Sequence, residues 1–207
     1  MKTLSVVFFA ISLFVINNST WAESDTKLLR FWKEVKIPGA KCGNGKPYSV
    51  WIDQRNPEKL AVEFMGGGAC WSKETCYGPN YRAWLFPVPR WPLISMFSAS
   101  SEKVSPTYDH TMVYLPYCTA DVYTGTQTAN YKEGKKTYHW GHLNTIKAFD
   151  YLNEQKLINF KAAKEFVLYG ASAGALGSFI HGKMIAELLS ENVTKTLIAD
   201  SPGLHYG

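Results

Sequence analysis

The sequence predicts an α/β fold in which helices flank a mainly parallel sheet, and two observations support this. Apolar runs of strand length alternate with segments of helical spacing along the 207 residues. One such run, 165–169, leads into Gly-Ala-Ser-Ala-Gly at 170–174, after which small residues continue with helical spacing. This is G-x-S-x-G between a strand and a helix, the setting in which a tight turn exposes the serine oxygen. The composition is that of a globular domain, with 46% hydrophobic and 19% charged residues.

The first 22 residues are predicted to be a secretory signal peptide. Lys2 gives a positive start, the run 4–16 is almost entirely apolar, and Thr20 and Ala22 are small residues at the positions that matter for cleavage. A membrane anchor is the alternative, but the apolar run is short for a bilayer. We therefore expect an exported protein, secreted or periplasmic, without stable membrane insertion.

The periodicity of apolar residues places the remaining elements. A short amphipathic helix is expected at 24–35, and a turn is expected at 56–58. The aromatic-rich stretch 72–106 is expected to be irregular with one short helix near 93–98. A polar loop rich in Gly and Thr is expected after 116–121, to about residue 136. The predicted strands are 48–52, 60–65, 111–115, 166–169 and 196–199, and the predicted longer helices are 139–153 and 173–189.

Four cysteines follow the predicted signal peptide, an even number that favours two disulfides in an exported protein. Four cysteines allow three pairings. A short loop could close between Cys70 and Cys76, which leaves Cys42 with Cys118. A zinc site is the alternative, but the spacings contain no C-x-x-C pair. We expect neither a metal nor another cofactor.

Three consecutive glycines, 66–68, directly follow the predicted strand 60–65. Glycines permit unusual backbone angles and the close approach of another group. In serine esterases a glycine-rich loop after an early strand donates backbone N–H groups to the oxyanion; the alternative is a flexible turn. With Ser172 as the nucleophile, the expected donors are the N–H of Ala173 and one or two N–H groups between Gly67 and Ala69.

A serine nucleophile needs a base, which in α/β-hydrolases is a histidine that follows the serine and the acid in the chain. Two histidines, His181 and His205, follow Ser172. His181 lies well inside the predicted helix and is expected to be a surface or packing residue. Asp200 and His205 are an alternative acid and base, although both would come from one short loop. We expect instead that the acid and base lie beyond residue 207, so that residues 23–207 form the N-terminal part of a single α/β-hydrolase-like catalytic domain.

Five stretches occur in an informative order. The most specific is 112–125, which reads Met-Val-Tyr-Leu-Pro-Tyr-Cys-Thr-Ala-Asp-Val-Tyr-Thr-Gly. The others are 41–48 with the first cysteine, 64–70 with the glycine run and nearby Cys76, 168–174 with the serine, and 197–201. Together they resemble the pectin acetylesterase and Notum-type carboxylesterase family over about residues 41–201.

The resemblance implies an extracellular ester hydrolase of α/β-hydrolase type with a Ser-Asp-His triad. The site residues that it implies are the nucleophile Ser172, the oxyanion donors Gly67, Gly68 and Ala173, and the disulfides Cys42–Cys118 and Cys70–Cys76. It also implies that Asp200 is not the catalytic acid, because the acid and base come much later in the chains of this family.

The expected reaction is the removal of an acyl group, with acetate on a polysaccharide such as pectin as the first candidate. A lipid or protein O-deacylase of Notum type is the alternative enzyme, and a non-catalytic binding protein on a hydrolase fold is the alternative of another class. We expect a monomer whose partner is an acylated carbohydrate or another ester. The net charge of +5 is mild and the basic residues are scattered, so no nucleic-acid partner is expected.

Overall fold

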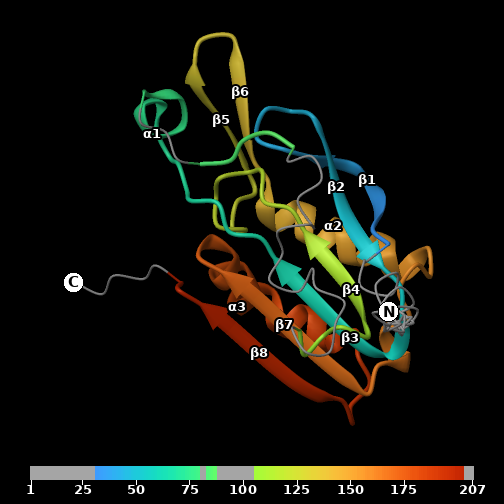
Figure 1. The fold of residues 1–207 in the computed structure, drawn as a ribbon. Helices are drawn as coiled ribbons and strands as arrows, with labels where there is room; N and C mark the ends of the chain where they lie inside the picture. The colour runs from blue at the N-terminus through green and yellow to red at the C-terminus, as the bar shows by residue number, and fades with distance from the viewer. Residues whose placement is uncertain (1–30, 80–82, 88–104, 203–207) are drawn as a thin grey trace, which may run out of the picture.

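The computed structural model describes residues 31–79, 83–87 and 105–202. The strands are β1 (Lys33–Lys41), β2 (Pro47–Asp53), β3 (Asn56–Phe64), β4 (His110–Leu115), β5 (Gln127–Lys132), β6 (Lys135–His139), β7 (Glu165–Ala171) and β8 (Thr194–Asp200). The helices are α1 (Lys73–Tyr77), α2 (Gly141–Glu154), the 3₁₀ helix η3 (Phe160–Ala162) and α3 (Ala173–Glu187). Six strands form one sheet in the order β1-β2-β4-β3-β7-β8, and β5 and β6 form a separate hairpin that extends away from it (Figure 1).

The sheet is parallel where the candidate site lies. Strands β4, β3, β7 and β8 are parallel neighbours, whereas β1 and β2 are antiparallel additions at one side. Parallel strands bring their carboxyl ends to one edge of the sheet, where the connecting loops can meet. This arrangement confirms the predicted α/β fold, and all five predicted strands and both predicted longer helices are present.

Both long helices pack on the same face of the sheet (Figure 1). Val62 and Phe64 of β3 share one buried apolar cluster with Leu152 of α2 and Ile185 of α3. Burying each large aliphatic or aromatic side chain stabilises the fold by about 1.5–3 kcal/mol. A smaller cluster on the opposite face consists of Ala61, Met112, Val167 and Tyr169.

The predicted helix 24–35 is wrong where the structure describes it, because β1 begins at Lys33. Val35 pairs with Val50 of β2 and is buried, while the residues on either side of Val35 are exposed. This alternation is that of a strand with one buried face, and pairing with β2 outweighs the local helical spacing. Residues 24–30 and the predicted helix near 93–98 lie outside the described residues.

Two further predictions need correction. The predicted turn at 56–58 is the beginning of β3, although Asn56 Oδ1 still accepts a hydrogen bond of 2.9 Å from the Glu58 backbone N–H, as in an Asx turn. The predicted loop between Asp121 and about residue 136 contains β5 and the start of β6. A two-residue connection, Glu133-Gly134, joins these strands, and Gly134 has φ +69°. Glycine in such a short connection is a hairpin signal that the polar composition obscured.

The structure contains the two disulfides Cys42–Cys118 and Cys70–Cys76, which confirms the expected pairing. The first connects the end of β1 to the segment after β4, and the second closes a short loop around α1. Within the described residues, no helix combines the length and apolar character needed to span a bilayer.

Candidate active site

Ser172 lies between the carboxyl end of β7 and the start of α3, and it is exposed. Its backbone angles are φ 53° and ψ −120°, a conformation that is costly for a residue with a side chain. The surroundings hold it in place: the Ser172 N–H donates to the Asp200 carbonyl oxygen at 2.8 Å, and the Ser172 carbonyl accepts from Ala175 N–H at 3.0 Å. This is the geometry of a nucleophile elbow between a strand and a helix.

The two glycines of the motif are required because the backbone passes too closely for a side chain. A Cβ on Gly170 would collide with the carbonyl oxygen of Gly174, and a Cβ on Gly174 would collide with the carbonyl oxygen of Phe64. Phe64 is the last residue of β3. The elbow therefore sits directly against the end of the neighbouring strand, and a methyl group at Gly174 could be accepted only if the backbone moved.

The glycine run 66–68 lies against the elbow. A Cβ on Gly66 would be 2.6 Å from the Ala171 carbonyl oxygen and 3.2 Å from Ser172 Cβ, while Gly68 has φ +72°. The backbone of the run thus comes within contact distance of the serine. Ala173 is the first residue of α3, so its N–H has no acceptor within the helix. Backbone N–H groups near a serine in this arrangement can stabilise a developing oxyanion.

Tyr123, which was not predicted from the sequence, connects the carboxyl ends of β3 and β4 with helix α3. Its hydroxyl group donates toward the carbonyl oxygens of Met65 at 2.8 Å and Leu115 at 3.1 Å. Met65 directly follows β3, and Leu115 is the last residue of β4. Its own carbonyl accepts a hydrogen bond of 2.9 Å from His181 Nε2 on α3. One residue therefore links the approach to the glycine run, the end of β4 and the helix after the serine.

Asp121 fixes the segment that carries Tyr123. Its carboxylate accepts from the Thr119 hydroxyl at 2.7 Å, from Tyr123 N–H at 3.2 Å and from Gly141 N–H at 2.6 Å. Gly141 begins α2, whose own N-cap residue makes no side-chain cap, so Asp121 caps that helix from a distant segment. A bridge between Ala69 and Asp121 attaches the glycine run to the same segment.

The described histidines have structural partners. His181 is buried, as a packing residue should be, and its ring stacks on Phe64 and His142 with centroids 5.9 and 5.0 Å apart. Burial lowers the pKa of His181, and proximity to His142 lowers it further, against the opposing effect of the bond to Tyr123. His181 is therefore a neutral donor from Nε2, which accounts for its contact with a carbonyl oxygen.

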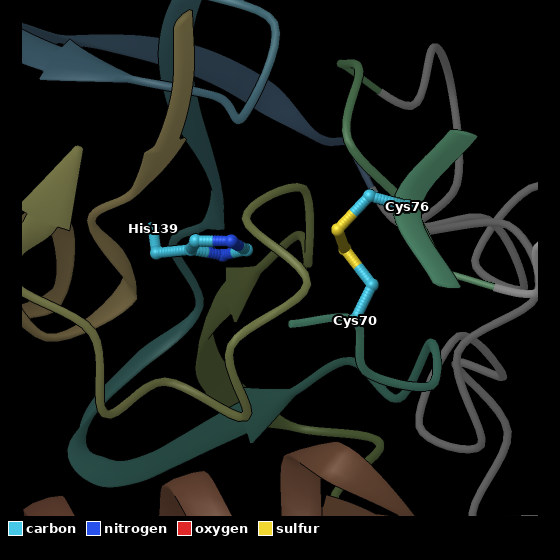
Figure 2. Close-up of side chains that lie close together, drawn as sticks. All are labelled: Cys70, Cys76 and His139. Carbon is cyan, nitrogen blue, oxygen red and sulfur yellow. A yellow bond between two sulfur atoms is a disulfide. The ribbon is translucent and has the colours of Figure 1, made fainter. Parts of the chain in front are cut away.

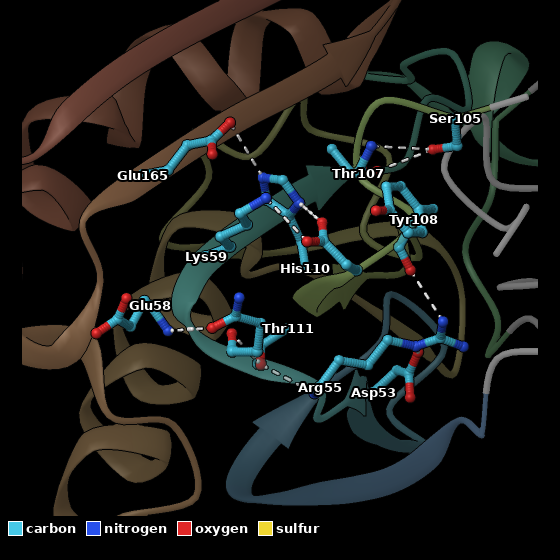
Figure 3. A network of polar contacts seen from close by, with 12 residues as sticks. Asp53, Arg55, Glu58, Lys59, Ser105, Thr107, Tyr108, His110, Thr111 and Glu165 are labelled. Carbon is cyan, nitrogen blue, oxygen red and sulfur yellow. Dashed lines mark hydrogen bonds and ion pairs between the residues drawn. The ribbon is translucent and has the colours of Figure 1, made fainter. Parts of the chain in front are cut away.

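His110 belongs to a polar network at the other edge of the sheet (Figure 3). Its Nδ1 lies 3.1 Å from Asp109 Oδ1, and its Nε2 lies 3.5 Å from Glu165 Oε1. Asp109 also pairs with Lys59 at 2.8 Å. His110 and Glu165 begin β4 and β7, whereas Ser172 follows the carboxyl end of β7. Because these strands are parallel, the network and the elbow lie at opposite ends of the sheet.

Asp200 lies beside the elbow through its backbone. It pairs with Ala171 across β7 and β8, and its exposed carboxylate accepts a hydrogen bond of 2.9 Å from the Ser201 hydroxyl group. His205 lies outside the described residues, so the Asp200–His205 alternative stays a prediction. The expectation of an acid and base beyond residue 207 also stays a prediction.

Replacing Tyr123 with phenylalanine is expected to lower the free energy of unfolding by about 1–2 kcal/mol, because the hydroxyl group that bonds the Met65 and Leu115 carbonyls is lost. Chemical denaturation measures this change. Tyr151→Phe on α2 is the matched control, because the Tyr151 hydroxyl takes no part in these contacts. Equal stability of the Tyr123 variant and the wild type would contradict the linking role.

Acidification is expected to destabilise the fold through His181. Its pKa is lowered by burial below the ordinary value of 6.5, so below about pH 6.5 the unfolded chain binds a proton that the folded chain does not. Stability should therefore fall as the pH drops from about 6.5 toward the lowered pKa of the folded state. Urea denaturation of wild type and His181→Gln across this range measures the effect, and the variant should show a shallower pH dependence. Identical slopes would show that another group is responsible.

Comparison with known proteins supports the fold. The structure of the Wnt deacylase Notum from Drosophila superposes with a TM-score of 0.62 at 18% identity, covering 83% of this chain and 53% of that chain. This likeness concerns the fold, which is of α/β-hydrolase type.

The sequence relatives also include Notum carboxylesterases. The palmitoleoyl-protein carboxylesterase notum1a of Danio rerio is 30% identical over 159 residues, and NOTUM of Mus musculus is 27% identical over 158 residues. Both matches cover 72% of this chain, which spans about 30% of the length of either relative. An inactive palmitoleoyl-protein carboxylesterase, notum1b of Danio rerio, is 27% identical over 53% of this chain and 81% of its own length. The pectinacetylesterase family model matches residues 21–205, and the chain therefore belongs to the pectinacetylesterase family.

Proposed function

We propose that this protein is a carboxylic ester hydrolase whose nucleophile is Ser172. The observation that carries the proposal is the exposed Ser172 at φ 53°, with the backbone of Gly66 packed against it. A strained serine at the tip of a strand–turn–helix connection is retained when the position of its oxygen matters. A non-catalytic binding protein on the same fold is the alternative of another class, and an intact elbow beside an intact glycine run argues against it.

In the proposed reaction the Ser172 oxygen attacks the carbonyl carbon of the ester. The N–H groups of Gly67, Gly68 and Ala173 hold the oxyanion, and the positive end of the α3 dipole adds to their effect. A histidine oriented by an acid takes the serine proton and passes it to the leaving alcohol. Water then attacks the acyl group on Ser172 and releases the carboxylic acid. We place the acid and base beyond residue 207, since His110, His139 and His181 are each held by a carboxylate or a carbonyl oxygen.

The first candidate substrate is an acetylated polysaccharide such as pectin, which the name of the matching family supports. A specific observation favours a second candidate, a protein or lipid carrying a longer acyl chain. The Trp84 ring packs 2.5 Å from where a Cβ of Gly67 would be, and it makes an edge contact with Phe86, whose side chain is 41% exposed. An exposed Phe86 beside a half-buried Trp84, next to the glycine run, could contact a hydrocarbon chain. Trp91 belongs to the same aromatic-rich stretch 72–106 and lies outside the described residues.

Export fits the same proposal. We propose that residues 1–22 are removed as a signal peptide and that the mature protein acts outside the cytoplasm on an acylated carbohydrate or another ester. The two disulfides support this, because disulfides persist in oxidising compartments.

Hydrolysis by the full-length protein tests the proposal. Release of p-nitrophenol from its acetate and octanoate esters, together with release of acetate from acetylated pectin, should be measured in parallel. Faster hydrolysis of acetyl esters supports the polysaccharide deacetylase, and faster hydrolysis of octanoate supports the deacylase of longer chains. No release from any ester by the folded protein would contradict the proposed function.

A further inference from the structure

Cys70, Cys76 and His139 form the single group of potential metal ligands found in the described part of the chain. Their ligand atoms lie within 4.8 Å of one another, and all three residues are buried. Cys70 precedes α1, Cys76 lies within it, and His139 ends β6. Figure 2 shows the imidazole ring of His139 extending toward the disulfide between the two cysteines. The metal ligand in proteins is the thiolate rather than a disulfide sulfur, so the oxidised pair shown here cannot bind a metal through its sulfurs.

His139 is the residue that suggests a further role for this disulfide, because one of its ring nitrogens has no partner in the part of the chain that the structure describes. Its Nδ1 lies 2.9 Å from the carbonyl oxygen of Thr119, and a carbonyl oxygen can only accept. Nδ1 therefore carries the proton, and Nε2 carries a lone pair. Nε2 is buried and has no hydrogen-bond partner among the described residues. The residue as a whole is more than nine-tenths buried. A buried acceptor left without a hydrogen bond is energetically unfavourable.

The arrangement of His139 is that of a metal-binding histidine. Such residues donate one ring N–H to a carbonyl or carboxylate, which fixes the tautomer and leaves the other nitrogen for the metal. Two thiolates and a neutral imidazole form a ligand set that suits Zn²⁺. The two negative charges neutralise the cation, so the occupied site would carry no net charge and could stay buried.

We propose that reduction of Cys70–Cys76 converts this cluster into a Zn²⁺ site. A dithiol supplies two electrons and two protons, is itself oxidised to a disulfide, and leaves Cys70 and Cys76 as thiols. Binding of Zn²⁺ then displaces both thiol protons, forming two Zn–S bonds and one bond to His139 Nε2, with water in the fourth position. Zn–S bonds of about 2.3 Å and a Zn–N bond of about 2.0 Å place the ligand atoms roughly 3.5–3.8 Å apart. The ligand atoms already lie within 4.8 Å of one another, and the two sulfur atoms can separate once the bond between them is reduced.

The ion would replace the disulfide as the link across the same loop. Cys70 lies two residues after Gly68, and its N–H donates to the Ala120 carbonyl oxygen at 2.8 Å. A link between Cys70 and Cys76 therefore restrains the chain directly after the glycine run. With Zn²⁺ bound, this restraint would persist under conditions that reduce the disulfide. The site is independent of the function proposed for Ser172.

Cobalt binding tests the proposal, because Co²⁺ occupies zinc sites and its thiolate complexes absorb light. The full-length protein is reduced with a dithiol, and the dithiol is removed under anaerobic conditions. The protein is then titrated with Co²⁺ and afterwards with Zn²⁺. The reduced wild type should bind one Co²⁺ with a thiolate charge-transfer band that Zn²⁺ abolishes, and the oxidised protein should show no such band. His139→Gln should bind at least tenfold more weakly, whereas the matched control His142→Gln should bind as the wild type does.

A Cys70→Ser, Cys76→Ser double variant separates this site from the other pair of thiols, Cys42 and Cys118. After reduction it should show no charge-transfer band. Circular dichroism of every sample checks that the fold is kept. A band in the double variant would overturn the proposal, and so would equal Co²⁺ affinity in His139→Gln and the wild type. A reduced wild type that does not bind Co²⁺ would also overturn it, whether the protein stays folded or unfolds and does not regain its fold with Zn²⁺.

Discussion

Replacing Ser172 with alanine is expected to lower kcat for ester hydrolysis by roughly 10⁴- to 10⁶-fold while KM changes little. The reason is that the acyl group has no oxygen to which it can transfer, whereas the glycine run and the substrate-binding surface are intact. Stopped and continuous assays with p-nitrophenyl acetate measure the loss. Ser190→Ala is the matched control. Ser190 lies beyond the end of α3, and its hydroxyl group donates to the carbonyl oxygen of Lys161, so its loss should not affect turnover.

A second substitution at the same position separates chemistry from strain. Ser172→Gly removes the same hydroxyl group, so its activity should be as low as that of Ser172→Ala. Glycine accepts φ 53° without the penalty that alanine pays, so the glycine variant should be the more stable of the two by about 1 kcal/mol. Retention of hydrolysis in both variants would remove Ser172 from the mechanism, and equal stability would contradict the strained elbow.

Replacing Gly174 with alanine is expected to have the largest effect on stability, lowering the free energy of unfolding by about 3 kcal/mol or more. The new methyl group would collide with the carbonyl oxygen of Phe64, which is backbone and cannot rotate away. Helix α3 and the end of β3 would have to separate. The same displacement would move the elbow relative to the glycine run, so hydrolysis should fall along with stability.

Gly182 on the same helix provides the control. A Cβ there would meet the flexible end of Leu168 at 3.3 Å, and its backbone has no positive φ. Alanine favours a helix over glycine by as much as about 1 kcal/mol, so Gly182→Ala should be neutral or stabilising. Urea denaturation of both variants measures the contrast. A similar loss of stability in the two would show that any methyl group on α3 is harmful, and that the contact between Gly174 and Phe64 has no special role.

The sequence allowed most of the fold to be predicted, because the parallel strands are continuous apolar runs and the long helices have clear spacing. It failed at β1 and at the β5–β6 hairpin. Val35 is buried only because β1 pairs with β2, a contact that helical spacing cannot reveal. The hairpin strands are mostly exposed and polar, so they lack the apolar alternation by which a strand is recognised.

The candidate site was predictable where a local motif defines it and unpredictable where distant residues support it. Ser172 and the glycine run were found because strand, turn and helix are adjacent in the chain. Tyr123 was missed because its hydroxyl group bonds Met65, which lies 58 residues away. The cap that Asp121 provides to α2 spans 20 residues. Such contacts follow from the packed fold, and the one available signal was that both residues lie within the distinctive stretch 112–125.

Mapping the site of covalent modification tests the role of Ser172 most directly. The full-length protein is treated with a fluorophosphonate probe, digested, and its peptides are identified by mass spectrometry. We predict a single adduct on Ser172, which disappears in Ser172→Ala and persists in Ser190→Ala. An adduct on another residue, or ester hydrolysis by a protein that never forms the Ser172 adduct, would contradict the assignment of Ser172 as the nucleophile.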